Sequence, residues 1–120
     1  MSFIRDNKLV ASSVVQEEVA EATFADAEVV IKNAKLGDTL TEFEIDVSIL
    51  FDGTAPKASI GIDTDHEKYL TESQCYLLAT GTYVIENTVV LASDETIKVY
   101  ITPDGSTQGA LTGTVRFLDT

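Results

Sequence analysis

Three acidic side chains at alternate positions, Asp63, Asp65 and Glu67, could supply oxygen ligands to a calcium ion from one short polar stretch. Calcium prefers several oxygen ligands, and carboxylates at alternate loop positions provide them. The calcium loop of this spacing has Asp or Asn as its third ligand and then Gly, whereas here Glu67 stands third and Lys68 follows it. The three residues are therefore weak calcium candidates, and we favour the alternative that they are solvated loop carboxylates. The sequence predicts no bound metal and no other cofactor.

A second set of carboxylates, Glu42, Glu44 and Asp46, has the chemistry of glycoside hydrolysis, in which two acidic side chains flank the bond that is cleaved. These residues recur at every second position, which places them on one face of a strand as an ordinary exposed row. The chain contains no Trp, so a cleft that stacks on sugar rings is harder to build. We expect no glycosidase site here.

The single cysteine, Cys75, lies in an apolar run, and we interpret it as a small buried core residue. A nucleophilic role would need a base beside the thiol, and the only histidine, His66, falls in a polar acidic stretch. The Gly-rich run 105–113 joins two predicted strands, so we interpret it as a hairpin loop and not as a phosphate-binding loop. The sequence thus predicts a protein that is not an enzyme, with no catalytic and no cofactor-binding residues.

The whole chain is acidic, because 20 Asp and Glu residues against 8 Lys and Arg residues give a net charge of −12. Residues 1–60 and residues 61–120 each carry −6, so the charge is not confined to a tail. Nucleic acids and anionic membranes attract basic surfaces, and we expect binding to neither. We interpret the charge as a device that keeps particles apart in solution, with a basic partner surface as the alternative.

The length of 120 residues suggests one domain that can bury a core without disulfides. No apolar signal segment follows Met1, and no apolar run reaches the roughly 18 residues that a membrane span requires. We therefore expect synthesis and folding in the cytoplasm.

The elements that position these side chains show a period of two. In the run 40–51 (LTEFEIDVSILF), acidic and polar residues alternate with apolar ones, the pattern of a half-buried strand. The predicted inner face consists of Phe43, Ile45, Val47, Ile49 and Phe51. Residues 95–102 and 110–118 alternate equally well, and we expect them to pair as a hairpin across the Gly-rich loop.

The remaining elements are shorter. We expect strands at 9–15, 28–32, 58–63, 73–79, 82–86 and 88–92, and a polar loop at 63–72. The segment 16–27 is predicted as a short strand or irregular connection, with a helix of one or two turns as the rival. Together these elements predict an all-β fold, a single antiparallel β-sandwich of the jelly-roll or Ig-like type with about eight to nine strands. The sandwich domain would cover residues 9–120, and residues 1–8 would form an N-terminal arm.

The order of turns and apolar positions over residues 36–118 resembles that of small all-β virion structural proteins of tailed bacteriophages. The resemblance is carried by GDTLTEFEIDV at 37–47, FDGTAP at 51–56, SIGI at 59–62 and the polar run DTDHEKYL at 63–70. It continues with GTY at 81–83, TIKVY at 96–100, PDGSTQG at 103–109 and VRFL at 115–118. It implies a capsid-decorating, head-fibre or tail-associated protein that is not an enzyme, and it transfers no catalytic residues.

Two functions from different classes remain open at this level. The preferred hypothesis is a virion structural protein, made in the host cytoplasm, whose partners are other virion proteins and copies of itself, with a trimer as one form. The alternative is a carbohydrate-binding β-sandwich module with a loop calcium site at Asp63, Asp65 and Glu67.

Overall fold

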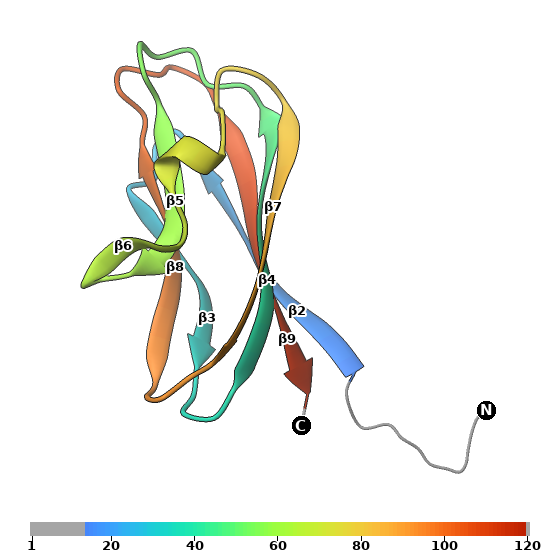
Figure 1. Ribbon diagram of the computed structural model, residues 1–120. Helices are drawn as coiled ribbons and strands as arrows, with labels where there is room; N and C mark the ends of the chain where they lie inside the picture. The colour runs from blue at the N-terminus through green and yellow to red at the C-terminus, as the bar shows by residue number, and fades with distance from the viewer. Residues whose placement is uncertain (1–13, 120) are drawn as a thin grey trace, which may run out of the picture.

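The computed structural model describes residues 14–119, which form two four-stranded antiparallel sheets packed face to face (Figure 1). The first sheet contains, in spatial order, β2 (Val14–Thr23), β9 (Ala110–Asp119), β4 (Thr39–Ile49) and β7 (Gly81–Val90). The second contains β3 (Glu28–Ala34), β8 (Glu95–Thr102), β5 (Lys57–Ile62) and β6 (Asp65–Leu70). A 3-10 turn, η1 (Glu72–Gln74), follows β6. The predicted all-β sandwich is confirmed.

Two features of the sequence-based prediction fall outside this part of the chain. The expected arm, residues 1–8, and all but the end of the expected strand 9–15 precede the described residues.

Within residues 14–119, no helix has the length and apolar character that crossing a membrane takes.

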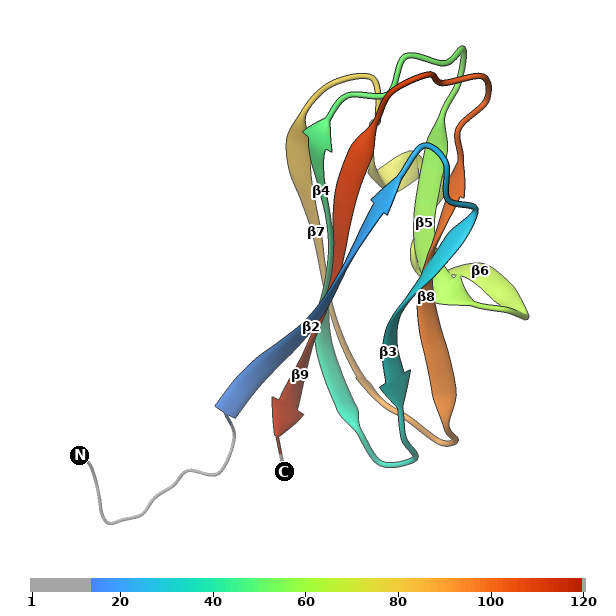
Figure 2. The same ribbon diagram turned by 180° about the vertical axis from the view of Figure 1, so that it is seen from behind.

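The strands pair as one long hairpin folded over on itself (Figure 2). β2 pairs with β9, β3 with β8, β4 with β7 and β5 with β6, so the first four strands match the last four in reverse order. Pairing of β4 with β9 and of β5 with β8 then joins these four strand pairs into two sheets. This double Greek key is a jelly roll. Of the two sandwich types that the sequence left open, the structure is therefore the jelly roll.

Alternate side chains of both sheets fill the space between them. β4 is central to the first sheet and contributes Leu40, Phe43, Ile45 and Val47, each at most 1% exposed. A register shift between Leu40 and Glu42 lets Leu40 and Phe43 both point inward. The second sheet supplies the opposing layer, made of Ile31, Ala58, Ile60, Ile97 and Val99. Burial of each large apolar side chain contributes about 1.5–3 kcal/mol relative to exposure, so this core is the main source of stability.

The predicted inner face of 40–51 is confirmed over most of its length and differs at its end. Ile49, the last residue of β4, is 52% exposed beside a second register shift against β9. Phe51 is fully buried, but it enters the core from the loop after the strand. The backbone N–H of Phe51 donates to the carbonyl of Leu77 at 2.8 Å, which holds this loop in place.

Residues 63–79 differ most from the prediction. The expected polar loop 63–72 contains strand β6, and the expected strand 73–79 is instead the end of η1 and a turn. β6 pairs with β5; its first four residues are polar and exposed, whereas Tyr69 and Leu70 are buried. Leu77 is only 1% exposed although its backbone is irregular. In this region, the apolar residues of the sequence therefore indicate which side chains are buried, but they do not indicate a strand.

The predicted hairpin of residues 95–102 and 110–118 is wrong, although both strands exist. β8 and β9 lie in different sheets, and the loop 103–109 crosses between them. Alternation shows which side chains face the core, but both sheets of a sandwich present the same pattern to it. The expected strands 82–86 and 88–92 are largely one strand, β7, and most of the segment 16–27 belongs to β2, so the helical rival is wrong.

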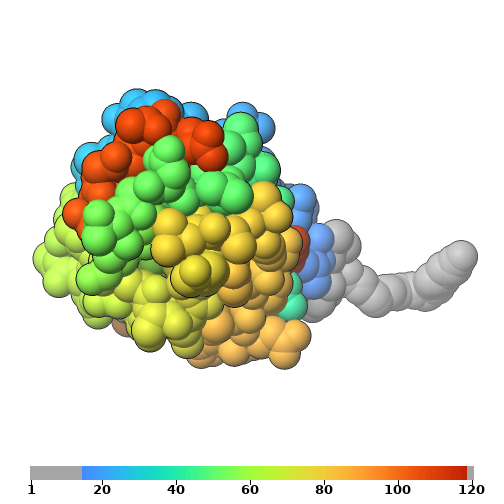
Figure 3. Space-filling view, turned by 90° about the horizontal axis from the view of Figure 1, so that it is seen from above, coloured from blue at the N-terminus to red at the C-terminus, as the bar shows by residue number. Residues whose placement is uncertain are grey.

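The crossing loop 103–109 is anchored at one end of the sandwich, where it lies beside the loops 50–56 and 71–80 (Figure 3). Asp52 accepts hydrogen bonds from the hydroxyl and the backbone N–H of Thr107, at 2.7 and 2.6 Å. These bonds lower the pKa of the Asp52 carboxyl. Gly109 then passes over the buried Phe51 ring with a φ of +143°.

Gly109→Ala is expected to lower the free energy of unfolding by about 3 kcal/mol or more. The φ of +143° disfavours any side chain, and an added Cβ would lie 2.5 Å from the Phe51 ring. Gly37→Ala is the matched control, because Gly37 has a φ of +90° but nothing within 4 Å of an added Cβ. It should cost only about 1–2 kcal/mol. Urea unfolding measures both, and equal losses would contradict the packing role of Phe51.

Candidate assembly surface

The outward side of the first sheet carries side chains in regular cross-strand rows, and we call this surface the acidic sheet face. Four residues from each strand define it: Val15, Glu17, Val19 and Glu21 of β2, Leu118, Arg116, Thr114 and Thr112 of β9, Thr39, Glu42, Glu44 and Asp46 of β4, and Val90, Glu86, Val84 and Thr82 of β7. The face contains six carboxylates and one basic side chain. Its charge is therefore strongly negative.

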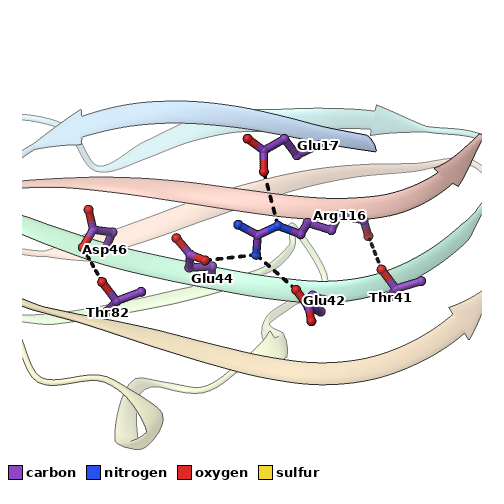
Figure 4. A network of polar contacts seen from close by, with 7 residues as sticks. All are labelled: Glu17, Thr41, Glu42, Glu44, Asp46, Thr82 and Arg116. Carbon is purple, nitrogen blue, oxygen red and sulfur yellow. Dashed lines mark hydrogen bonds and ion pairs between the residues drawn. The ribbon is translucent and has the colours of Figure 1, made fainter. Parts of the chain in front are cut away.

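Arg116 lies at the centre of the acidic sheet face between three carboxylates (Figure 4). Its Nε donates to Glu17 at 3.2 Å, and its Nη1 donates to Glu42 at 3.2 Å and to Glu44 at 3.0 Å. One guanidinium thus joins β2, β9 and β4. Partial burial lowers the pKa of Arg116, but the hydrogen bond to Glu44 and the surrounding negative charges outweigh it, so the pKa is raised.

The strand register explains this arrangement. Arg116 of β9 stands opposite Glu17 of β2 on one side and Glu42 of β4 on the other. Glu44 is two residues further along β4 and therefore on the same face. The sequence correctly suggested that Glu42 and Glu44 share the outward face of a strand. It missed Arg116, whose only signal was a basic residue among the outward positions of the last strand.

Exposed valines lie on both sides of the cross-strand row that contains Arg116. That charged row consists of Glu17, Arg116, Glu42 and Glu86. Val19 of β2 and Val84 of β7 are 54% and 44% exposed, in the row that also contains Glu44 and the buried Thr114. A second row of the face contains Val15 and Val90, which are 58% and 65% exposed. Apolar surface beside charged groups is the composition of a protein-binding surface and not of a catalytic cleft.

Of the three calcium candidates, Asp63 lies in the turn between β5 and β6, and Asp65 and Glu67 lie on β6; each accepts a hydrogen bond from another group of the protein. Asp63 accepts hydrogen bonds from Lys98 at 3.0 Å and from the Tyr100 hydroxyl at 2.8 Å. Asp65 accepts from the backbone N–H of Glu67 at 3.1 Å. Among residues 14–119, no three His, Cys, Asp or Glu side chains are grouped so that they could hold a metal ion. Calcium binding by these residues stays a sequence-based hypothesis that the geometry does not support.

The cysteine and the histidine are also engaged elsewhere. Cys75 donates to the carbonyl of Ala58 at 3.2 Å, and burial raises the pKa of its thiol to about 11. A thiol of that pKa is a poor nucleophile near neutral pH. His66 stacks on the ring of Tyr100, with ring centroids 3.8 Å apart. The thiol and the imidazole thus have separate structural contacts.

Arg116→Met is expected to lower the free energy of unfolding by about 2 kcal/mol at low salt, because three neighbouring carboxylates lose their shared cation. High salt should reduce the loss, since it screens the repulsion among them. Arg116→Lys is the control that keeps the charge without the planar fork, and its loss should be smaller. Urea unfolding at low and high NaCl measures these values. A loss that does not change with salt would contradict the electrostatic account.

Asp63 is expected to have a pKa below the usual 3.8, because the Tyr100 hydroxyl and Lys98 stabilise its charged form. A carboxyl whose pKa is lower in the folded than in the unfolded chain stabilises the fold above the unfolded pKa, and this contribution is lost as the pH falls through the folded pKa. Tyr100→Phe should therefore raise the pKa of Asp63 and reduce the loss of stability below about pH 4. Carboxyl NMR titration and melting temperatures measure both, and an unchanged pKa in the variant would argue against the bond.

Comparison with known proteins finds similarity of structure only. No protein-family model and no curated protein matches the sequence. A chain from the acidic stable capsid structure of Helicobacter pylori bacteriophage KHP30 has a TM-score of 0.70 with 11% identity, over 90% of each chain. A chain from the capsid asymmetric unit of cyanophage Pam1 has a TM-score of 0.63 with 12% identity, over 96% of this chain and 95% of that one. At such identities the likeness is one of fold. It confirms, at that level, the resemblance to small all-β phage virion proteins.

Proposed function

We propose that the protein is a structural component of a phage virion that decorates the head through protein–protein contacts. The observation that carries the proposal is the KHP30 capsid chain, which shares the jelly roll over 90% of both chains. Coverage this high in both directions means that the two chains are of similar length. The Pam1 capsid chain gives the same match at 96% and 95% coverage.

The geometry supports a mechanical role over a catalytic one. Glu42 and Glu44, two of the three carboxylates considered for glycoside hydrolysis, are both hydrogen-bonded to Arg116. The acidic sheet face is built on four paired strands, so hydrogen bonds between the strands hold its backbone rigidly. A rigid surface loses little entropy on binding, which favours assembly. We infer that this face is the contact surface, that the partners are other virion proteins and copies of this chain, and that the protein acts without catalysis.

The small area of the acidic sheet face limits how strongly it can bind a partner by itself. Three strand spacings of about 4.8 Å and six residue rises of about 3.4 Å give roughly 14 by 20 Å. A standard interface buries about 800 Å² on each partner, so a contact through this flat area alone would be weak. Many weak contacts on a repeating shell, or a second contact from the same chain, would make the binding stable. Synthesis in the host cytoplasm, and a net charge of −12 that keeps finished particles dispersed, fit this role.

The proposal predicts that the protein is present in purified virions of the phage that encodes it, in many copies and in fixed proportion to the shell protein. Quantitative mass spectrometry of gradient-purified particles measures the proportion, and immunogold electron microscopy with antibodies against the purified protein gives its position. Labelling over the head surface is the expected result. Absence from particles, together with abundance in the soluble fraction of infected cells, would rule out the virion role.

A further inference from the structure

The first 13 residues differ in charge from the rest of the chain. They contain Arg5 and Lys8 against Asp6, a net charge of +1, whereas residues 14–120 contain 6 basic and 19 acidic residues, a net charge of −13. An acidic surface would therefore attract residues 1–13, whereas it would repel the rest of the chain taken together.

The apolar residues of the same segment sit on both sides of its charges. Phe3 and Ile4 precede Arg5, and Leu9 and Val10 follow Lys8. The acidic sheet face has the matching order, in which a row of carboxylates lies between rows with exposed valines. The segment and the face are thus complementary both in charge and in apolar surface.

The segment reaches this face more readily on a second copy than on its own. Val14, the first residue of β2, is paired with Asp119 at the end of β9, so residues 1–13 are joined to the sheet at its end and not at the middle of the acidic sheet face. To reach its own face the chain would have to reverse direction just before Val14, whereas a neighbouring copy that lies beyond the end of the sheet requires no reversal. Thirteen extended residues span up to about 43 Å, enough to cross a four-stranded sheet of a neighbour.

Direct pairing of two β2 edge strands is one other way in which copies could join along this sheet. It would bring together Glu17, Glu18 and Glu21 of each copy, and β2 contains no basic residue to offset them. Like charges facing each other across paired strands are destabilising. A basic segment on the acidic sheet face avoids this repulsion.

We propose that residues 1–13 of one copy bind the acidic sheet face of a second copy. Arg5 and Lys8 would lie against the carboxylates of the face, and the apolar residues beside them would cover Val19 and Val84. This deepens the proposed function, because it supplies the second contact that the small face requires. It concerns the purified protein alone, so its failure would leave a virion role on other contacts intact.

The test is a charge exchange in the full-length protein, followed by sedimentation equilibrium over a range of concentrations. Wild type should self-associate, and Arg5→Glu with Lys8→Glu should weaken association by about tenfold or more. Adding Glu21→Lys and Glu86→Lys, two exposed residues of the face, should restore it. Lys35→Glu with Lys57→Glu is the control, because it makes the same change in net charge at exposed positions outside the segment.

Each outcome decides the proposal. Loss in the double variant, rescue in the fourfold variant and no loss in the control would support it. A monomeric wild type, unchanged association of the double variant, absence of rescue, or equal loss in the control would overturn it. Circular dichroism melting of every variant checks that the fold is kept. Val84→Thr, which removes little volume from an exposed site, should also weaken association. An unchanged association constant in this variant would contradict the apolar part of the contact.

Discussion

The register of β4 is the constraint on which the rest of the structure depends. Between β9 and β7, this strand directs Phe43, Ile45 and Val47 into the core, and Glu42 and Glu44 to the outside. A slip of one residue would exchange the two sets and bury the carboxylates without partners. The hydrophobic core therefore fixes the position of β4, and through β4 it fixes the pairing of its neighbours.

The acidic sheet face is a consequence of the same register. Once β4 and β9 are aligned, Arg116 must lie beside Glu42 and Glu44, and β2 adds Glu17 on the other side. One cation is too few for the carboxylates of this face, which therefore keeps a negative charge between rows of exposed valines. The fold creates the surface, and the functional proposals depend on that surface and not on any cleft.

Sequence alone predicted those parts of the fold in which one face of a strand is polar. The strands at 39–49, 95–102 and 110–119 were recognisable from strict alternation, because side chains point to opposite faces at every second residue in a strand but not in a helix. Sheet membership was not readable, since β8 and β9 show the same pattern in different sheets. β6 was not predicted because most of its exposed residues are charged. A strand was wrongly predicted at 73–79 because apolar residues such as Leu77 are buried there in a turn. The network around Arg116 depends on strand neighbours, which alternation does not specify.

A cryo-electron microscopy reconstruction of the virion at side-chain resolution would test the central claim most directly, because it shows which surface of the jelly roll contacts other chains. The account predicts that the acidic sheet face is covered by a neighbouring chain, with basic side chains of that neighbour close to Glu42, Glu44 and Glu86. A reconstruction in which this face is open to solvent, and the protein is attached through the β3–β8–β5–β6 sheet or the loops, would contradict it.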